Sequence, residues 1–151
     1  MPEINLFLGS SALFAGIVSS TGAARALLLL AENDTITVTI SEQVVAETER
    51  AIARKVPEAL ADLRQAILAS KAQIVHDPSK AEVMANLQLI SHSADIPILL
   101  AAMKAKVDYL VTLNRIHFMD DPEVAIKSGQ RIGTPGDALV WVRSQLSDRN
   151  S

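Results

Sequence analysis

The chain has 151 residues, of which 49% are hydrophobic and 21% are charged, and its formal net charge is −3. This length suits one ordinary domain, and the hydrophobic content excludes a disordered chain. Because the sequence has no cysteine, a disulfide scaffold is excluded and a reducing cytoplasm is favoured. The slightly negative charge gives no general attraction to nucleic acid, so any such contact must be local.

The apolar stretches are too short for a membrane protein. No uninterrupted run is longer than that at residues 26–31, which falls far below the roughly 20 residues that a spanning helix needs. The first residues also lack the basic start and apolar stretch of a secretory signal. We therefore expect a cytoplasmic protein with no membrane segment.

Short β-rich runs alternate with longer helical patterns along the chain. The predicted strands are residues 4–8, 35–40, 72–75, 108–112 and, as a last short strand, 131–133. The predicted helices are residues 11–33 with a break at Gly22, then 42–54, 57–70, 80–90, 95–106 and 135–146. This order predicts a three-layer α/β/α fold with a mostly parallel central sheet flanked by helices. We expect a single domain over residues 1–147 and a polar C-terminal tail over 148–151.

Glu47 is the first candidate functional residue. Ser41 is placed to cap the helix predicted at 42–54, and Val44, Thr48 and Ile52 form its core-facing stripe. Glu47 falls on the edge of that stripe. It is either a boundary carboxylate whose aliphatic stem covers the core or an acid that serves a site.

Asp95 is the second candidate. Ile98, Leu99 and Ala102 form the apolar stripe of its helix, so the Asp95 carboxylate lies on the inward side of the helix start. Such a residue can cap the backbone N–H groups or hold a metal ion, and the two roles are compatible.

The third candidate region follows the buried strand at 108–112, because ligand sites of parallel sheets lie beyond the carboxyl ends of the strands. Asn114 suits a turn cap as well as a site residue. His117 has no partner at metal-ligand spacing, so a structural or surface role is favoured. Asp120 and Asp121 have the pattern of turn residues.

Other chemistries are not supported. The sequence contains no glycine-rich phosphate loop, no nucleophile elbow and no zinc pattern. Hard oxygen ligands for Mg²⁺ or Mn²⁺ are what remains.

Taken together, these motifs resemble the PIN-domain family, and in particular its small VapC-like members. The resemblance extends over essentially the whole chain, and residues 111–118 are similar to a toxin subgroup of the family. The matching segments are Phe7-Leu8-Gly9-Ser10-Ser11-Ala12-Leu13, Ile40-Ser41-Glu42-Gln43-Val44-Val45-Ala46-Glu47, Ala94-Asp95-Ile96-Pro97-Ile98-Leu99 and Asp108-Tyr109-Leu110-Val111-Thr112-Leu113-Asn114.

The resemblance implies a Mg²⁺- or Mn²⁺-dependent endoribonuclease, often the toxin of a toxin–antitoxin pair. In the family, several acidic residues converge on the metal, which activates water and stabilises charge on the scissile phosphate. Glu47 and Asp95 match two of these acids, and Asn114 stands where many members have Asp. Thr112 and Ser10 match polar neighbours that orient ligands or phosphate, and Arg115 is a further candidate phosphate contact.

Gly9 departs from the family pattern, because it occupies the position of the first-strand Asp, usually the central metal ligand. Without that carboxylate a divalent cation should be held more weakly, since the charge of the ligands tunes affinity. The sequence therefore predicts a ribonuclease whose activity is weakened or lost.

Two further interpretations stay open. The chain is alternatively a catalytically inactive PIN-fold module that binds RNA or a protein, with Arg50, Arg54 and Arg115 holding phosphate. A receiver-like or flavodoxin-type module is the third reading, although such receivers gather acids after the first strand and Gly9-Ser10-Ser11 has none.

The resemblance also implies partners: a homodimer, an RNA substrate and an antitoxin that covers the pocket. The C-terminal helix carries Leu139 and Trp141, which serve either the core or a dimer surface.

Overall fold

The computed structural model describes residues 3–149. Its centre is a five-stranded sheet in which every pair of neighbouring strands is parallel. The strands are β1 (Asn5–Leu8), β2 (Thr37–Ser41), β3 (Gln73–Val75), β4 (Tyr109–Val111) and β5 (Ile132–Gly133), in the order β3-β2-β1-β4-β5. The predicted α/β class and the mostly parallel sheet are confirmed.

β1 lies at the middle of the sheet and is covered on both faces. Leu6, Phe7 and Leu8 are at most 1% exposed, as a continuous apolar run in a parallel strand predicts. Leu6 pairs with Val38 on one side and with Tyr109 on the other. At the end of β1, Leu8 pairs with Val111, the last residue of β4, so these two strands end side by side.

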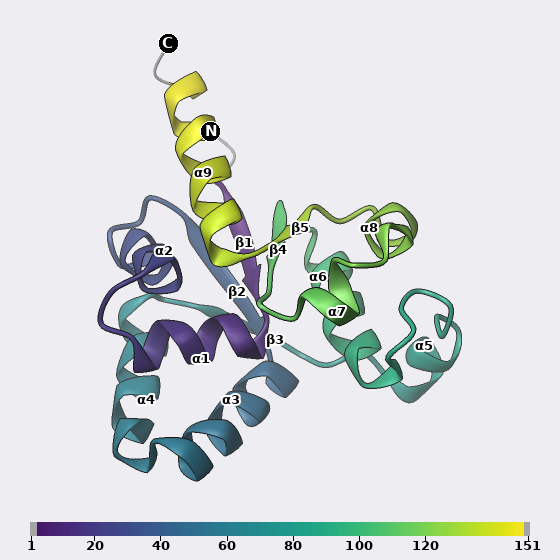
Figure 1. Ribbon diagram of the computed structural model, residues 1–151, viewed down its shortest axis with the longest axis horizontal. Helices are drawn as coiled ribbons and strands as arrows, with labels where there is room; N and C mark the ends of the chain where they lie inside the picture. Colours follow the sequence, from purple (N-terminus) through teal and green to yellow (C-terminus); the bar gives the residue numbers. More distant parts are fainter. Residues whose placement is uncertain (1–2, 150–151) are drawn as a thin grey trace.

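Helices cover both faces of the sheet, with α1, α2 and α4 on one side and α6, α7 and α8 on the other (Figure 1). The helices are α1 (Ser10–Val18), α2 (Ala23–Glu32), α3 (Glu42–Lys55), α4 (Leu60–Ala69), α5 (Lys80–Met84), α6 (Ile96–Ala105), α7 (Arg115–Phe118), α8 (Pro122–Ser128) and α9 (Pro135–Arg149). Short 3₁₀ turns, Pro57–Ala59 and Ser93–Asp95, precede α4 and α6. This is the three-layer arrangement that the sequence predicts.

Helix α3 begins where the sequence places it. The Ser41 side chain accepts a hydrogen bond from the Val44 N–H at 3.3 Å, which satisfies one of the unpaired donors of the first turn. Val44, Thr48 and Ile52 are fully buried on the inner side of the helix. Glu47 is thereby fixed on the border of that side, half-buried.

Several boundaries differ from the prediction. The helix predicted at 80–90 begins at the capping box of Ser79 and Glu82 but ends already at Met84, and residues 85–88 form turns. The C-terminal helix runs to Arg149, past the predicted end at residue 146 and into the tail predicted at 148–151, of which 150 and 151 lie outside the described residues.

Two short helices, α7 and α8, lie between β4 and β5, where the sequence analysis predicts no helix and gives turn character only to Asn114, Asp120 and Asp121. Asp121 accepts a hydrogen bond from the Glu123 N–H at 3.0 Å, and Pro122 is the first residue of α8, so these two residues begin a helix. Gly129 ends α8 in the left-handed conformation, with φ of 69°. Asp120 and Asp121 lie in the bend before Pro122, as the turn interpretation predicts, and Asp121 also caps α8.

Within residues 3–149, no single helix is long and apolar enough to cross a membrane. α1 and α2 reach the required length and apolarity only as a pair, which is bent by 87° at its break.

Candidate functional site

The candidate site lies beyond the carboxyl ends of β1 and β4, where the order of the strands along the chain changes direction. Ligand sites of open α/β sheets form at such switch points, because the connections after the two strands leave toward opposite faces of the sheet and open a crevice between them. Here the two strands are β1 and β4. The Gly9 N–H donates to the Val111 carbonyl at 2.9 Å, which holds the two strand exits together. A small cavity of about 70 Å³ lies here, lined by Gly9, Ser10, Ser11, Asp95, Ile98, Leu110, Thr112, Asn114 and Phe118.

Asp95 points into this site rather than capping its helix. It occupies the position before Ile96, the first residue of α6, yet its side chain accepts no capping hydrogen bond. Its Oδ2 instead lies 2.7 Å from Nδ1 of His117, and the Asp95 side chain is only 14% exposed. Of the two roles left open for Asp95, the capping role is wrong, and the carboxylate is available to a site.

The surroundings of Asp95 favour the uncharged carboxyl group. Burial raises the pKa of Asp95, and it does so more than contact with His117 lowers it. The nearby negative charge of Glu47 raises the pKa further, whereas His92 lowers it. A cation in the cavity would oppose both of the effects that raise this pKa.

Glu47 is joined to the same region through its neighbours. Ser10, the first residue of α1, donates a hydrogen bond to Glu47 Oε1 at 2.9 Å, and Gln43 Nε2 donates to Oε2 at 3.3 Å. Gln43 Nε2 also donates to the carbonyl of Ala94, next to Asp95, at 3.1 Å. Glu47 does not line the small cavity itself; it lines a neighbouring hollow of about 480 Å³ that shares Ser10 and Ser11 with it.

Asn114 and Thr112 complete the cavity from the β4 side. Thr112 is 3% exposed, and its Oγ1 accepts a hydrogen bond from the Asn114 N–H at 3.0 Å. Asn114 Oδ1 accepts from the His117 N–H at 3.2 Å, so Asn114 caps α7, as its turn-forming character predicts. The structure therefore brings Asp95, Asn114 and Thr112 to one cavity.

His117 and His92 are the residues that the sequence analysis missed. The expectation that His117 has no partner was wrong, because α7 carries its ring to Asp95. The His92 ring stacks on the His117 ring with 4.0 Å between centroids. A local signal was present: Asn is a favoured helix N-cap, so Asn114 directly after a buried strand predicts a short helix that carries His117 at the edge where sites form.

Gly9 has a backbone conformation that suits a larger residue, although a side chain there would press on the backbone of β4. Its φ of −72° and ψ of 167° are extended backbone that any residue adopts. A Cβ added here would lie 3.3 Å from the Val111 carbonyl and 3.8 Å from the Thr112 side chain. A carboxylate at position 9 would therefore enter the same cavity that Thr112 lines.

The oxygens that line the cavity suit a small hydrated cation. Asp95 supplies its one carboxylate, and Ser10, Ser11, Thr112 and Asn114 supply neutral oxygens of the kind that Mg²⁺ and Mn²⁺ accept. About 70 Å³ holds an ion with one or two waters, since a water takes roughly 30 Å³. The donor set fits a divalent cation, and its low charge predicts weak binding.

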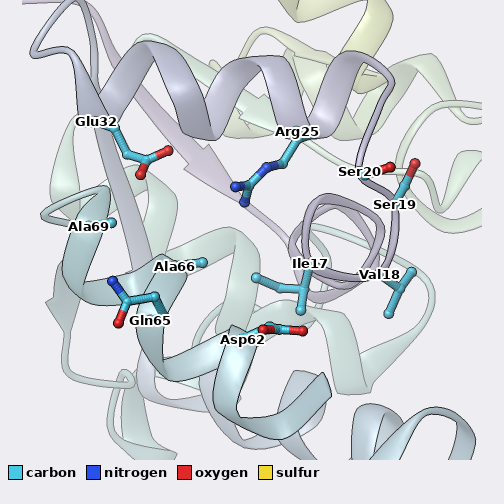
Figure 2. Close-up of a pocket in the computed structure, with 10 residues that line it drawn as sticks. All are labelled: Ile17, Val18, Ser19, Ser20, Arg25, Glu32, Asp62, Gln65, Ala66 and Ala69. Atoms are coloured by element: carbon cyan, nitrogen blue, oxygen red, sulfur yellow. The ribbon is translucent and has the colours of Figure 1, made fainter. Parts of the chain in front are cut away.

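The remaining polar candidates lie around the cavity. Ser10 lines it, whereas Arg115 is exposed at the start of α7 and borders a separate hollow. A further hollow of about 450 Å³ lies between α1, α2 and α4, with the Arg25 side chain projecting into it (Figure 2). None of the predicted site residues lines that hollow.

Comparison with known families matches residues 5–116 to the PIN domain. This match covers most of the chain and includes Gly9, Glu47, Asp95 and Asn114. The chain therefore belongs to the PIN-domain family.

Solved structures show the same fold. PAE2754 from Pyrobaculum aerophilum is 17% identical, with a TM-score of 0.64 over 93% of this chain and 96% of that one. VapBC2 from Rickettsia felis, bound to a DNA fragment from its promoter, is 22% identical, with a TM-score of 0.59 over 87% and 98%. Mycobacterium tuberculosis VapC20, a toxin that cleaves the sarcin–ricin loop, is 17% identical, with a TM-score of 0.51 over 70% and 86%. The comparison with curated proteins gave no match.

Proposed function

We propose that this chain is a metal-dependent endoribonuclease of the VapC type, with activity lowered by Gly9. The observation that carries the proposal is the convergence of Asp95, Asn114 and Thr112 on one cavity at the exit of β1, in a chain of the PIN-domain family. The likeness in fold to VapC20, a toxin that cleaves RNA of the sarcin–ricin loop, supports the substrate class.

The residues of this chain divide the work by position. Asp95 and Asn114 would hold Mg²⁺ or Mn²⁺, which when bound supplies a more acidic water and stabilises charge on the phosphate. Thr112 fixes the backbone of Asn114, and Ser10 fixes the carboxylate of Glu47. Glu47, half-buried beside the neighbouring hollow, takes up the proton of the attacking water. The exposed Arg115 binds the phosphate, and Ser10 donates to it only when its hydrogen bond to Glu47 is released, because the hydroxyl has one proton to give.

Gly9 sets the level of activity. It contributes no side-chain oxygen to a cavity in which Asp95 is the one carboxylate among the lining residues. Loss of one group from a catalytic set commonly costs orders of magnitude in rate. We expect cleavage that needs high metal concentrations.

A catalytically inactive module that binds RNA or a protein is the second candidate, and the same Gly9 favours it. Arg50 and Arg54 on α3 and Arg115 on α7 are all exposed, so they can meet phosphates without a metal. In this case RNA binding persists in the presence of a chelator, and no cleavage follows at any metal concentration.

Cleavage of labelled RNA with Mg²⁺ or Mn²⁺ separates the two candidates. Gly9→Asp should raise the cleavage rate by about 10-fold or more, whereas Gly9→Ala, which adds a Cβ without an acid, should not. Asp95→Ala should abolish the activity of the Gly9→Asp protein. If the Gly9→Asp protein stays inert with ample metal, the nuclease proposal fails; if Asp95→Ala leaves cleavage unchanged, the assignment of the site fails.

The proposed biological setting is a toxin–antitoxin pair in the cytoplasm. The likeness to VapBC2 supports an antitoxin partner, and the absence of cysteine suits a reducing compartment. A homodimer is proposed from the family. Of the residues considered for its surface, Leu139 and Trp141 are partly buried against the core, whereas Val140 between them is 68% exposed.

A further inference from the structure

Two imidazole rings and one carboxylate meet at the rim of the candidate site. His92 lies in the turn before α6, Asp95 lies at the start of α6, and His117 lies on α7. One nitrogen or oxygen of each side chain lies within 4.8 Å of the corresponding atom of the other two. These residues use two of the three histidines in the sequence.

The contacts around His117 conflict with one another. Asp95 Oδ2 lies 2.7 Å from Nδ1 of the ring, and Asn114 Nδ2 lies 2.8 Å from the same atom. The amide nitrogen can only donate, so it requires Nδ1 to accept. An ionised Asp95 would instead require Nδ1 to donate, and a protonated Asp95 would compete with the amide for the one lone pair of Nδ1. Turning the Asn114 amide over would not help, since its oxygen already accepts from the His117 N–H.

A metal ion on Nδ1 would remove the conflict between Asp95 and the ring, because it takes lone pairs from both, and the Asn114 amide would then lose Nδ1 as its acceptor. Proteins bind first-row transition metals with imidazole and carboxylate ligands, and imidazole favours Zn²⁺, Co²⁺ or Ni²⁺ over Mg²⁺. With bonds of about 2.0–2.1 Å in a tetrahedral site, ligand atoms lie roughly 3.3 Å apart. Asp95 Oδ2 and His117 Nδ1, now 2.7 Å apart, would therefore open slightly, and His92, whose exposed ring stacks on His117, would turn toward the ion to close the remaining spacing.

We propose that His92, Asp95 and His117 form a binding site for a transition metal ion such as Zn²⁺ or Co²⁺. The site shares Asp95 with the proposed nuclease centre, yet it stands without RNA cleavage, because it concerns metal binding alone. It also places a cation beside Asp95 without any carboxylate at position 9. The three side chains leave the remaining coordination positions to water from the solvent side of His92.

Titration of the full chain with Co²⁺, followed by its visible absorption, tests the proposal. Nitrogen ligation changes the colour of the ion, and Zn²⁺ should bleach the signal by competition. Loss of an outer-shell partner alone lowers metal affinity about 10–100-fold, so His92→Gln, which removes a direct ligand, should lower the Co²⁺ affinity at least 10-fold. His76→Gln is the matched control, because it removes the one histidine outside the cluster and should leave the affinity within about twofold.

Two results would overturn the proposal: no change in the Co²⁺ spectrum on mixing, or equal Co²⁺ affinity in His92→Gln and His76→Gln. Because His92 is exposed, its substitution should not alter folding, and circular dichroism of the metal-free variants checks this. The two proposals fail separately. If RNA cleavage depends on Asp95 but not on His92, and Co²⁺ gives no spectral signal, only the transition-metal site is contradicted. If Co²⁺ binds but the Gly9→Asp protein does not cleave RNA, only the nuclease proposal is contradicted.

Discussion

Ser10 Oγ donates a hydrogen bond of 2.9 Å to Glu47 Oε1, which joins the first turn of α1 to the middle of α3. Both residues are half-buried, so water competes only partly for this contact. The bond fixes the carboxylate beside the exit of β1, although the two residues are far apart in the sequence.

The Ser10–Glu47 bond should appear as a coupling energy. Ser10→Ala and Glu47→Ala, measured alone and together by urea unfolding, should give a coupling of about 1 kcal/mol, because each single change already removes the bond. Ser10→Ala with Glu49→Ala is the control, since Glu49 is exposed on the same helix and should couple negligibly. A Ser10–Glu47 coupling no larger than the control would contradict the bond.

Metal should stabilise the Gly9→Asp protein more than the natural chain. Without metal, the new carboxylate lies near Asp95 and the negatively charged Glu47, and this repulsion should lower the melting temperature slightly. Mn²⁺ at about ten times its dissociation constant should then stabilise the variant by about 1.4 kcal/mol, since a ligand of the folded state shifts unfolding by mass action. Thermal melts with and without Mn²⁺ measure this; equal shifts in both proteins would count against the cavity as the metal position.

The backbone of Asn114 should depend on the hydroxyl of Thr112. Thr112→Val keeps the shape but removes the oxygen that accepts the Asn114 N–H at 3.0 Å, at a cost of about 1–2 kcal/mol. Hydrogen exchange of the Asn114 amide should be faster in Thr112→Val and protected in Thr112→Ser, which retains the oxygen. Equal exchange in the two variants would show that the hydroxyl does not hold this turn.

Tyr109 should ionise at unusually high pH. Burial raises its pKa, the charge of Asp137 raises it further, and Arg131 lowers it. The folded protein thus favours the neutral phenol. Its contribution to the free energy of unfolding is fully present below the tyrosine pKa of the unfolded chain, about 10, and is lost as pH rises through the higher pKa of folded Tyr109. Tyr109 is the only tyrosine, so the absorption of tyrosinate reports it directly.

The control for Tyr109 is the same absorption titration of the chain unfolded in urea. The folded midpoint should lie above the unfolded one, and Asp137→Asn should bring it down. A folded midpoint at or below the unfolded midpoint would mean that the phenol is not buried as described.

The sequence was sufficient to predict the layers of the fold and the edge of the sheet at which the site lies. A continuous apolar run predicts the buried β1, and Ser41 predicts the start of α3, because both signals are local. The inward placement of Asp95 also follows from local helical spacing. These features need no knowledge of which segments meet.

What the sequence could not reveal depends on segments that are distant along the chain. The pairing of Asp95 with His117 requires that the turns after Met84 and the short helix α7 converge, and neither has a strong periodic pattern. α8 was within reach, because an Asp followed by Pro and, later, a Gly is a known helix start and stop. It is only seven residues long, so its periodic pattern is too short to predict a helix by itself.

The central place of β1 also governs when the site can form during synthesis. Gly9 is among the first residues made, but the N–H of Gly9 bonds to the carbonyl of Val111, and β1 pairs with β4. A nascent chain that has not yet released residues 109–117 therefore lacks both the cavity wall and the His117 contact. Such late, long-range pairing slows folding, so a truncated product that ends before β4 should carry neither metal affinity nor nuclease activity.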